Sequence, residues 1–131
     1  LNGNAKPDVR CFFEDSQHRI WVGSRKGIFV IDPHRKKVIA HYNHTKNGLP
    51  NDLIRTINQD PKGKIWIGTF GEGLAVYTPE MKEVARFNTS SGFCSNSINY
   101  IFTFSINDDK MNLYVLIVEM VIERWNHYDY S

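Results

Sequence analysis

Residues 60–69 read DPKGKIWIGT, and residues 15–24 read DSQHRIWVGS. Each stretch begins with an aspartate and ends with an apolar–tryptophan–apolar triplet, a glycine and a small hydroxyl residue. Residues 108–116, DDKMNLYVL, carry a weaker third copy in which Tyr114 takes the place of Trp21 and Trp66. These three aromatic residues are 45 and 48 positions apart, so the chain repeats with a period of about 45 residues.

The rest of the unit also repeats. Asp32-Pro33 and Thr78-Pro79 are turn signals at matching positions, because proline cannot donate to a sheet ladder. Each unit contains four short apolar or alternating segments separated by turn residues, and in the second unit these lie at about 53–60, 63–69, 73–78 and 83–88. Four short strands per 40–50 residues are typical of a propeller blade.

The sequence therefore predicts an all-β fold, a partial β-propeller of about three four-stranded blades, with the third incomplete. The whole chain, residues 1–131, forms one propeller fragment with units at about 1–50, 51–95 and 96–131. Helical periodicity is weak except across 113–125. Closed propellers use 4–8 blades. We therefore expect either further blades in a longer protein or self-association that covers the open sheets.

The repeat resembles the two-component regulator propeller repeat. The resemblance lies in the Asp-turn-Gly hairpin of Asp60 and Gly63, in residues 65–69, and in the Gly-Leu-Pro segment at 48–50. It implies the non-catalytic periplasmic sensor region of a hybrid histidine kinase, with the kinase located outside this segment. Residues 115–121 depart from the family pattern, since apolar residues stand where the family has glycines. A pair of compensating frameshifts is one hypothesis for this departure.

Residues that recur at equivalent positions are interpreted as structural. The tryptophans could stack on a sugar ring, but their place in the middle of a strand favours packing between blades. The recurring aspartates favour turn capping over catalysis, because an aspartate side chain accepts from nearby backbone N–H groups. The residues assigned to the structural repeat are Asp15, Trp21, Gly23, Gly27, Asp60, Trp66, Gly68, Gly73, Asp108 and Tyr114.

Composition excludes several function classes. With 16 basic and 14 acidic residues the net charge is +2, which gives no case for nucleic acid or an anionic membrane. The longest apolar run, 113–118, is far shorter than the roughly 20 residues of a spanning helix. Cys11 and Cys94 lack metal-site spacing, so we expect no metal and no cofactor, while a disulfide between them stays open.

The expected ligand is an oligosaccharide or a partner protein. Loops at one face of a propeller converge around its axis, so the connections between second and third strands are the candidate site. This reasoning singles out Arg25, Lys26, Phe70 and Glu72. We expect a sensor or interaction module in the periplasm. The alternatives are a fragment of a propeller enzyme such as a lyase, which needs converging His and Glu side chains that the pattern does not show, and a truncated or frameshifted remnant.

Overall fold

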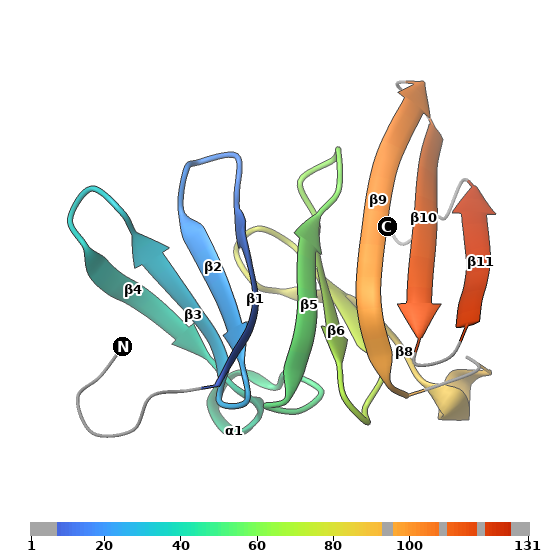
Figure 1. The fold of residues 1–131 in the computed structure, drawn as a ribbon, viewed down its shortest axis with the longest axis horizontal. Coiled ribbons are helices and arrows are strands. Elements are labelled where there is room, and N and C mark those ends of the chain that lie inside the picture. Colours follow the sequence, from blue (N-terminus) through green and yellow to red (C-terminus); the bar gives the residue numbers. More distant parts are fainter. Residues whose placement is uncertain (1–7, 93–95, 108–109, 118–119, 127–131) are drawn as a thin grey trace.

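The computed structural model describes residues 8–92, 96–107, 110–117 and 120–126, with side chains for residues 8–92, 96–98 and 101. The described chain forms three antiparallel sheets that follow one another along the sequence (Figure 1). In the described chain, each sheet consists of strands that are consecutive in the sequence and paired in that order. The predicted all-β partial propeller is confirmed.

The first sheet contains β1 (Val9–Glu14), β2 (Ile20–Ser24), β3 (Gly27–Asp32) and β4 (Lys37–Tyr42), paired in that order. Burial is concentrated in the two middle strands, where four residues of each strand are buried. β4, at the outer edge, is mostly exposed. Its exposed residues include Lys37 and also the apolar Val38 and Ile39, which are each 41% exposed.

The second sheet repeats this arrangement with β5 (Ile54–Gln59), β6 (Ile65–Thr69), β7 (Leu74–Tyr77) and β8 (Glu83–Phe87). Every residue of β6 and β7 is buried. The sheet is covered on one face by the first sheet and on the other by the third, which explains why its strands lack polar alternation.

The third sheet contains β9 (Ile98–Asn107), β10 (Lys110–Ile117) and β11 (Met120–Asn126), ordered β11-β10-β9. Three strands rather than four confirm that the third blade is incomplete within the described residues. The helical periodicity across 113–125 does not produce a helix in the described residues, because β10 and β11 form there and β10 pairs with both β9 and β11.

The first strands of the three sheets, β1, β5 and β9, lie side by side, as expected of the innermost strands around a propeller axis (Figure 1). Short capped helices lead from one blade to the next. Asn43 caps α1 (His44–Asn47), and Asn88 caps the 3₁₀ turn η1 (Thr89–Ser91). In the described part of the chain, no helix has the length and apolarity needed to cross a membrane.

The main core lies between the first and second sheets. A Cβ atom added at Gly23 would meet Cys11 of the same sheet and Ile54 and Ile57 of β5 in the next sheet. Thr56 and Ile98 hold the same relation to Gly68 at the second junction. The glycine therefore lets the next blade pack directly on the backbone of the preceding blade, which is why it recurs in the repeat.

Candidate ligand site

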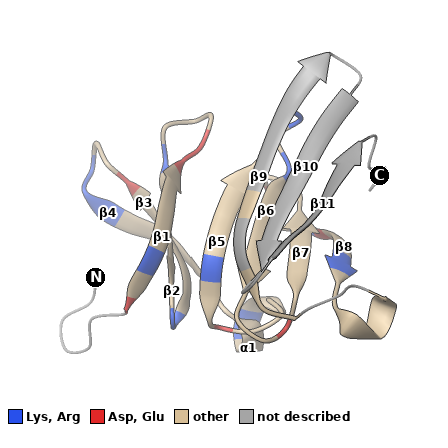
Figure 2. Cartoon of the chain, turned by 45° about the vertical axis from the view of Figure 1, so that its right-hand side comes forward, with Lys and Arg blue, Asp and Glu red and all other residues tan. Residues whose placement is uncertain are grey.

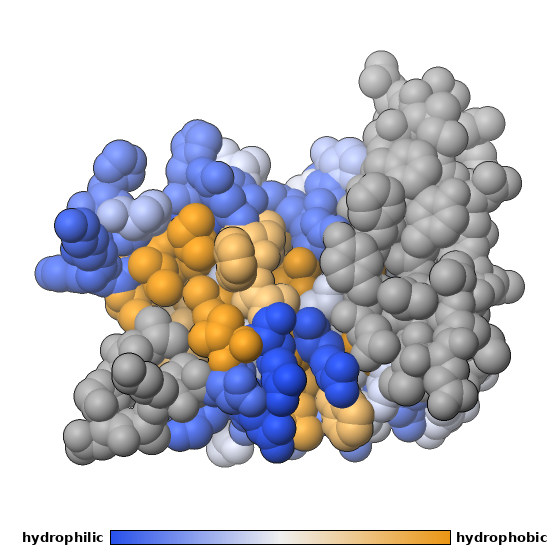
Figure 3. Space-filling view, in the orientation of Figure 1, coloured by the Kyte–Doolittle hydropathy of each residue, from blue (hydrophilic) through white to orange (hydrophobic). Residues whose placement is uncertain are grey.

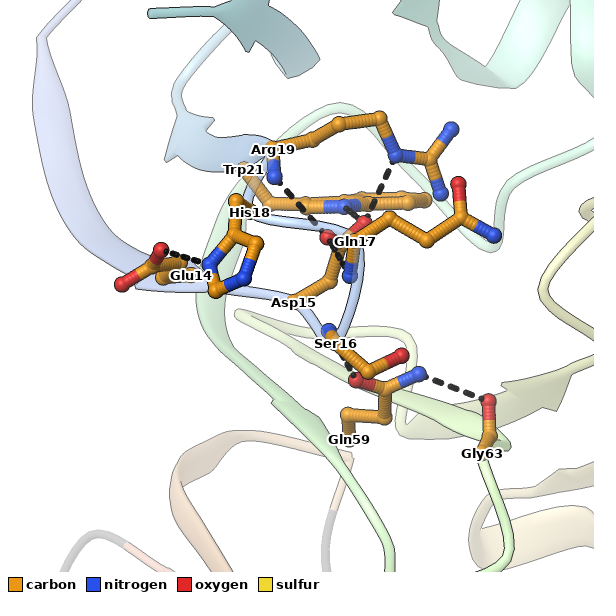
Figure 4. A network of polar contacts seen from close by, with 9 residues as sticks. All are labelled: Glu14, Asp15, Ser16, Gln17, His18, Arg19, Trp21, Gln59 and Gly63. Atoms are coloured by element: carbon orange, nitrogen blue, oxygen red, sulfur yellow. Dashed lines mark hydrogen bonds and ion pairs between the residues drawn. The ribbon is translucent and has the colours of Figure 1, made fainter.

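The recurring spacing of aspartate and tryptophan builds a hydrogen-bonded hairpin (Figure 4). Oδ1 of Asp15 accepts from the backbone N–H groups of Gln17 and Arg19, while Oδ2 accepts from Arg19 Nε and from Trp21 Nε1. Burial alone would raise the pKa of Asp15, but the hydrogen bonds from Trp21 and the turn outweigh it and lower that pKa. This carboxylate is engaged on both oxygens and holds the turn.

The second blade repeats the hairpin. Asp60 accepts from the backbone N–H groups of Lys62 and Lys64 and from the indole of Trp66. Asp60 is only 4% exposed, so its carboxylate is inside the blade rather than at an open surface. The third aspartate of the repeat, Asp108, lies outside the described residues.

The tryptophans are enclosed. Trp21 and Trp66 have at most 1% of their surface exposed. Trp21 is stacked between Phe13 and Tyr42, with ring centroids 5.9 and 6.0 Å away. A sugar would need an open ring face, so this arrangement leaves these side chains to packing. Tyr114 lies on β10 and pairs with Phe102 of β9 in the backbone register.

Two further repeat glycines allow a close backbone approach within each blade. A Cβ atom at Gly27 would lie 2.3 Å from the carbonyl oxygen of Tyr42, and one at Gly73 would lie 2.1 Å from that of Phe87. Both glycines also have φ near +90°. Gly27 begins β3 and Gly73 immediately precedes β7, and each lies against the last residue of the fourth strand, an approach that only glycine permits.

A surface pocket of about 120 Å³ lies where the first two blades meet. It is at the end of the molecule that carries the β2–β3 and β6–β7 loops and α1 (Figure 1). The lining combines three arginines with apolar residues: Arg10, Arg25, Leu53, Ile54, Arg55 and Phe70. Figure 3 shows strongly hydrophilic residues beside an apolar area on this face.

Two of the four residues singled out from the sequence line this pocket. They are Arg25 of the β2–β3 loop and Phe70 of the β6–β7 loop. Lys26 and Glu72 occupy the same loops, but neither lines the pocket. Their backbone N–H groups instead donate to the hydroxyls of Ser24 and Thr69, which close the two loops.

Sequence reasoning missed Arg10 and Arg55. Both stand at β-bulges: the register with the neighbouring strand shifts between Val9 and Cys11 in β1 and between Ile54 and Thr56 in β5. A bulge leaves one residue outside the ladder and redirects its side chain. The available signal was the spacing of 45 residues between Arg10 and Arg55, which equals the spacing of the tryptophans.

Three basic residues contribute to the lining of the pocket. Figure 2 shows basic segments on the adjacent strands β1 and β5. Arg10 pairs with Asp8 at 3.0 Å, and both side chains are about half exposed. The guanidinium of Arg55 lies 4.7 Å from the ring centroid of Phe70, a cation–π arrangement that holds both groups at the pocket wall.

The remaining chemistry of the described residues is limited. Cys11 is a free thiol, and burial raises its pKa to about 11 despite backbone hydrogen bonds from Gly23 and Ile57. Such a thiol is a poor nucleophile at neutral pH. Cys94 lies outside the described residues. Among the described side chains, no three of His, Cys, Asp and Glu are grouped to hold a metal ion.

Comparison with known proteins identifies the repeat. A family model described as "Two component regulator propeller" matches residues 5–26 and 48–71. These segments include both Asp-to-Trp hairpins, residues 15–24 and 60–69. No curated protein matches the chain.

Solved structures share the fold. The extracellular domain of BT3049 from B. thetaiotaomicron, assigned as a hybrid two component system, is 40% identical, with a TM-score of 0.79 over 98% of this chain. The extracellular domain of BT4673 from the same organism is 22% identical, with a TM-score of 0.70 over 86% of the chain. PorZ of Porphyromonas gingivalis, a surface component of the type-IX secretion system, is 21% identical, with a TM-score of 0.63 over 82%.

This chain spans only 18% of the BT3049 structure and 16% of each of the other two. The BT4673 and PorZ structures, at 22% and 21% identity, support the fold alone. The 40% identity to BT3049 agrees with the match to the family model. Together with the repeated hairpins and the blade geometry, these matches identify residues 5–26 and 48–71 as repeats of the two-component regulator propeller family.

Proposed function

We propose that this chain is a non-catalytic part of a periplasmic sensor domain in a two-component signalling system. The observation that carries the proposal is the 40% identity over 98% of the chain to the extracellular domain of BT3049. The buried, fully engaged Asp15 supports a binding role over catalysis, as does the enclosure of Trp21 and Trp66. An oligosaccharide or a partner protein would be received on the loop face, where the arginine pocket lies.

Two measurements test this proposal. Protease treatment of intact cells and of spheroplasts, with an epitope tag on the protein that contains the chain, should give cleavage only after the outer membrane is opened. Thermal shift of the purified chain against a panel of oligosaccharides should give a rise in Tm with no change in the sugars by chromatography. A cytoplasmic protein would contradict the location, and turnover of any sugar would favour the enzyme alternative.

We also propose that the open face of β1 packs against another blade of the same repeat. Val9 and Phe12 are 51% and 74% exposed, whereas Ile54 and Ile57, 45 positions later, are 1% and 6% exposed. The second pair is covered because it packs at Gly23 of the preceding blade. Ile98 and Ile101, in the third blade, are fully buried.

The occupant that fits this face is a strand with glycine at the position of Gly23 and Gly68. The chain's own third unit carries Leu116 at that position, two residues after Tyr114. A head-to-tail second copy would therefore present a leucine where both observed junctions have a glycine. A further repeat with the Ile-Trp-Ile-Gly-Thr pattern matches the observed junctions better than a second copy of this chain does.

A further inference from the structure

We propose that the pocket between the first two blades binds an anionic group, so that the ligand is an acidic rather than a neutral saccharide. The saccharide part of this inference rests on the proposed sensor function. The charge part rests on the residues of the pocket, whose lining includes three arginines and no carboxylate.

The three arginines come from separate parts of the fold. Arg10 is on β1, Arg25 is in the β2–β3 loop, and Arg55 is on β5 of the next blade. The chain has a net charge of only +2, so three arginines around one small pocket are a local feature. Asp8, paired with Arg10 at 3.0 Å, offsets one of these positive charges.

Backbone geometry makes this cluster part of the repeat. Arg10 and Arg55 occupy the unpaired bulge positions of their strands, and in β9 the pairing with β10 passes from Tyr100 to Ile98, which skips Asn99. The same bulge therefore recurs in all three innermost strands. Bulges are frequent beside binding sites because they redirect a side chain out of the ladder.

The shape and chemistry suit a carboxylate on a ring. A guanidinium presents paired N–H donors that match the two oxygens of a carboxylate, and such charge-assisted bonds are stronger than neutral ones. Leu53, Ile54 and Phe70 supply an apolar wall beside these donors, suited to the C–H face of a sugar ring. Phe70 is 46% exposed, so this wall is open to a ligand.

Binding by the 131-residue chain should be measured by isothermal titration calorimetry with digalacturonate, with the neutral disaccharide lactose, and with inorganic sulfate. Digalacturonate should bind, lactose should bind at least about tenfold more weakly, and added salt should weaken binding because the contacts are ionic. Sulfate distinguishes the sources of the anion: weak competition is expected from the shared charge, whereas binding as tight as that of digalacturonate would contradict a saccharide site.

Arg55→Gln should weaken digalacturonate binding about tenfold, the effect expected for one charge-assisted hydrogen bond. Arg35→Gln is the matched control, since Arg35 lies in the β3–β4 turn and pairs with Asp32. Arg55→Lys should restore only part of the affinity, because lysine keeps the charge but not the paired donors. Thermal melts of each variant separate loss of binding from loss of folding.

Equal effects of Arg55→Gln and Arg35→Gln would overturn the inference. Lactose binding as tightly as digalacturonate would also overturn it, while leaving the proposed sensor function intact. If neither these saccharides nor the wider oligosaccharide panel bound, the acidic-saccharide inference and the sugar-sensing form of the proposed function would both fail.

Discussion

The indole nitrogen of Trp66 lies 2.9 Å from Oδ2 of Asp60 and donates a hydrogen bond to it, and Trp21 makes the same bond to Asp15 at 2.8 Å. This bond ties the turn between the first two strands to the aromatic residue in the middle of the blade. The two residue types therefore recur together, because each satisfies a buried polar atom of the other.

Replacement of Asp60 by asparagine should destabilise the chain by about 3 kcal/mol. The variant keeps one acceptor, but its amide group cannot accept from both the turn and the Trp66 indole. Urea unfolding followed by tryptophan fluorescence measures the change. Asp32→Asn, in the exposed β3–β4 turn, is the control and should have a much smaller effect; equal effects would mean that the buried network contributes no more than the exposed turn.

Acidification should remove the contribution of Asp15 to stability. The pKa of Asp15 is lowered in the folded protein, so its carboxylate stabilises the fold above the unfolded-state value of about 3.9 and loses this effect as the pH falls through the lower, folded value. The difference in free energy of unfolding between the wild type and Asp15→Asn should therefore shrink below about pH 4. A constant difference between pH 7 and pH 2 would contradict the lowered pKa.

Substitution of Gly68 by alanine should cost about 1–3 kcal/mol through overpacking at the junction between the second and third blades. The added Cβ would lie 2.6 Å from Thr56 Cγ2 and 2.8 Å from Ile98 Cγ2. Thr56→Ser removes the first of these methyl groups and should recover part of the loss in the double variant. Simple additivity of the two single effects in a double-mutant cycle would show that these groups do not meet.

The thiol of Cys11 should react slowly with a disulfide reagent at pH 8. With a pKa of about 11, its thiolate is roughly 100-fold rarer than that of an ordinary cysteine at this pH. In a Cys94→Ser variant, Cys11 should label rapidly only after unfolding in guanidinium. Rapid labelling of the folded variant would show that the Cys11 side chain is neither buried nor raised in pKa.

The exposed Phe12 should promote association of the isolated chain. Phe12→Glu is expected to reduce the concentration-dependent growth in apparent mass measured by light scattering, with little change in Tm, because this side chain is 74% exposed. Addition of one consensus repeat before residue 8 should have the same effect and should make Phe12→Glu destabilising. If the added repeat leaves Phe12→Glu harmless, the face does not receive a blade.

The sequence by itself determined the blade. The period of about 45 residues, the Asp-to-Trp hairpin and the prolines at strand ends are local features, and local turn chemistry is encoded by neighbouring residues. The segment expected at 63–69 forms β6 at 65–69, and the one expected at 83–88 forms β8 at 83–87. Even Arg25 and Phe70 of the pocket followed from loop position alone.

Only the tertiary structure decided which residues meet across blades. The packing of Ile54 on Gly23 joins residues 31 positions apart, and Arg10 and Arg55 line one pocket because two bulged strands lie in adjacent sheets. A bulge depends on the register between strands, which sequence periodicity does not specify. The arginine-lined pocket therefore exists only once the first two blades have packed together. The strands and turns of each blade, in contrast, are determined by the residues of its own repeat.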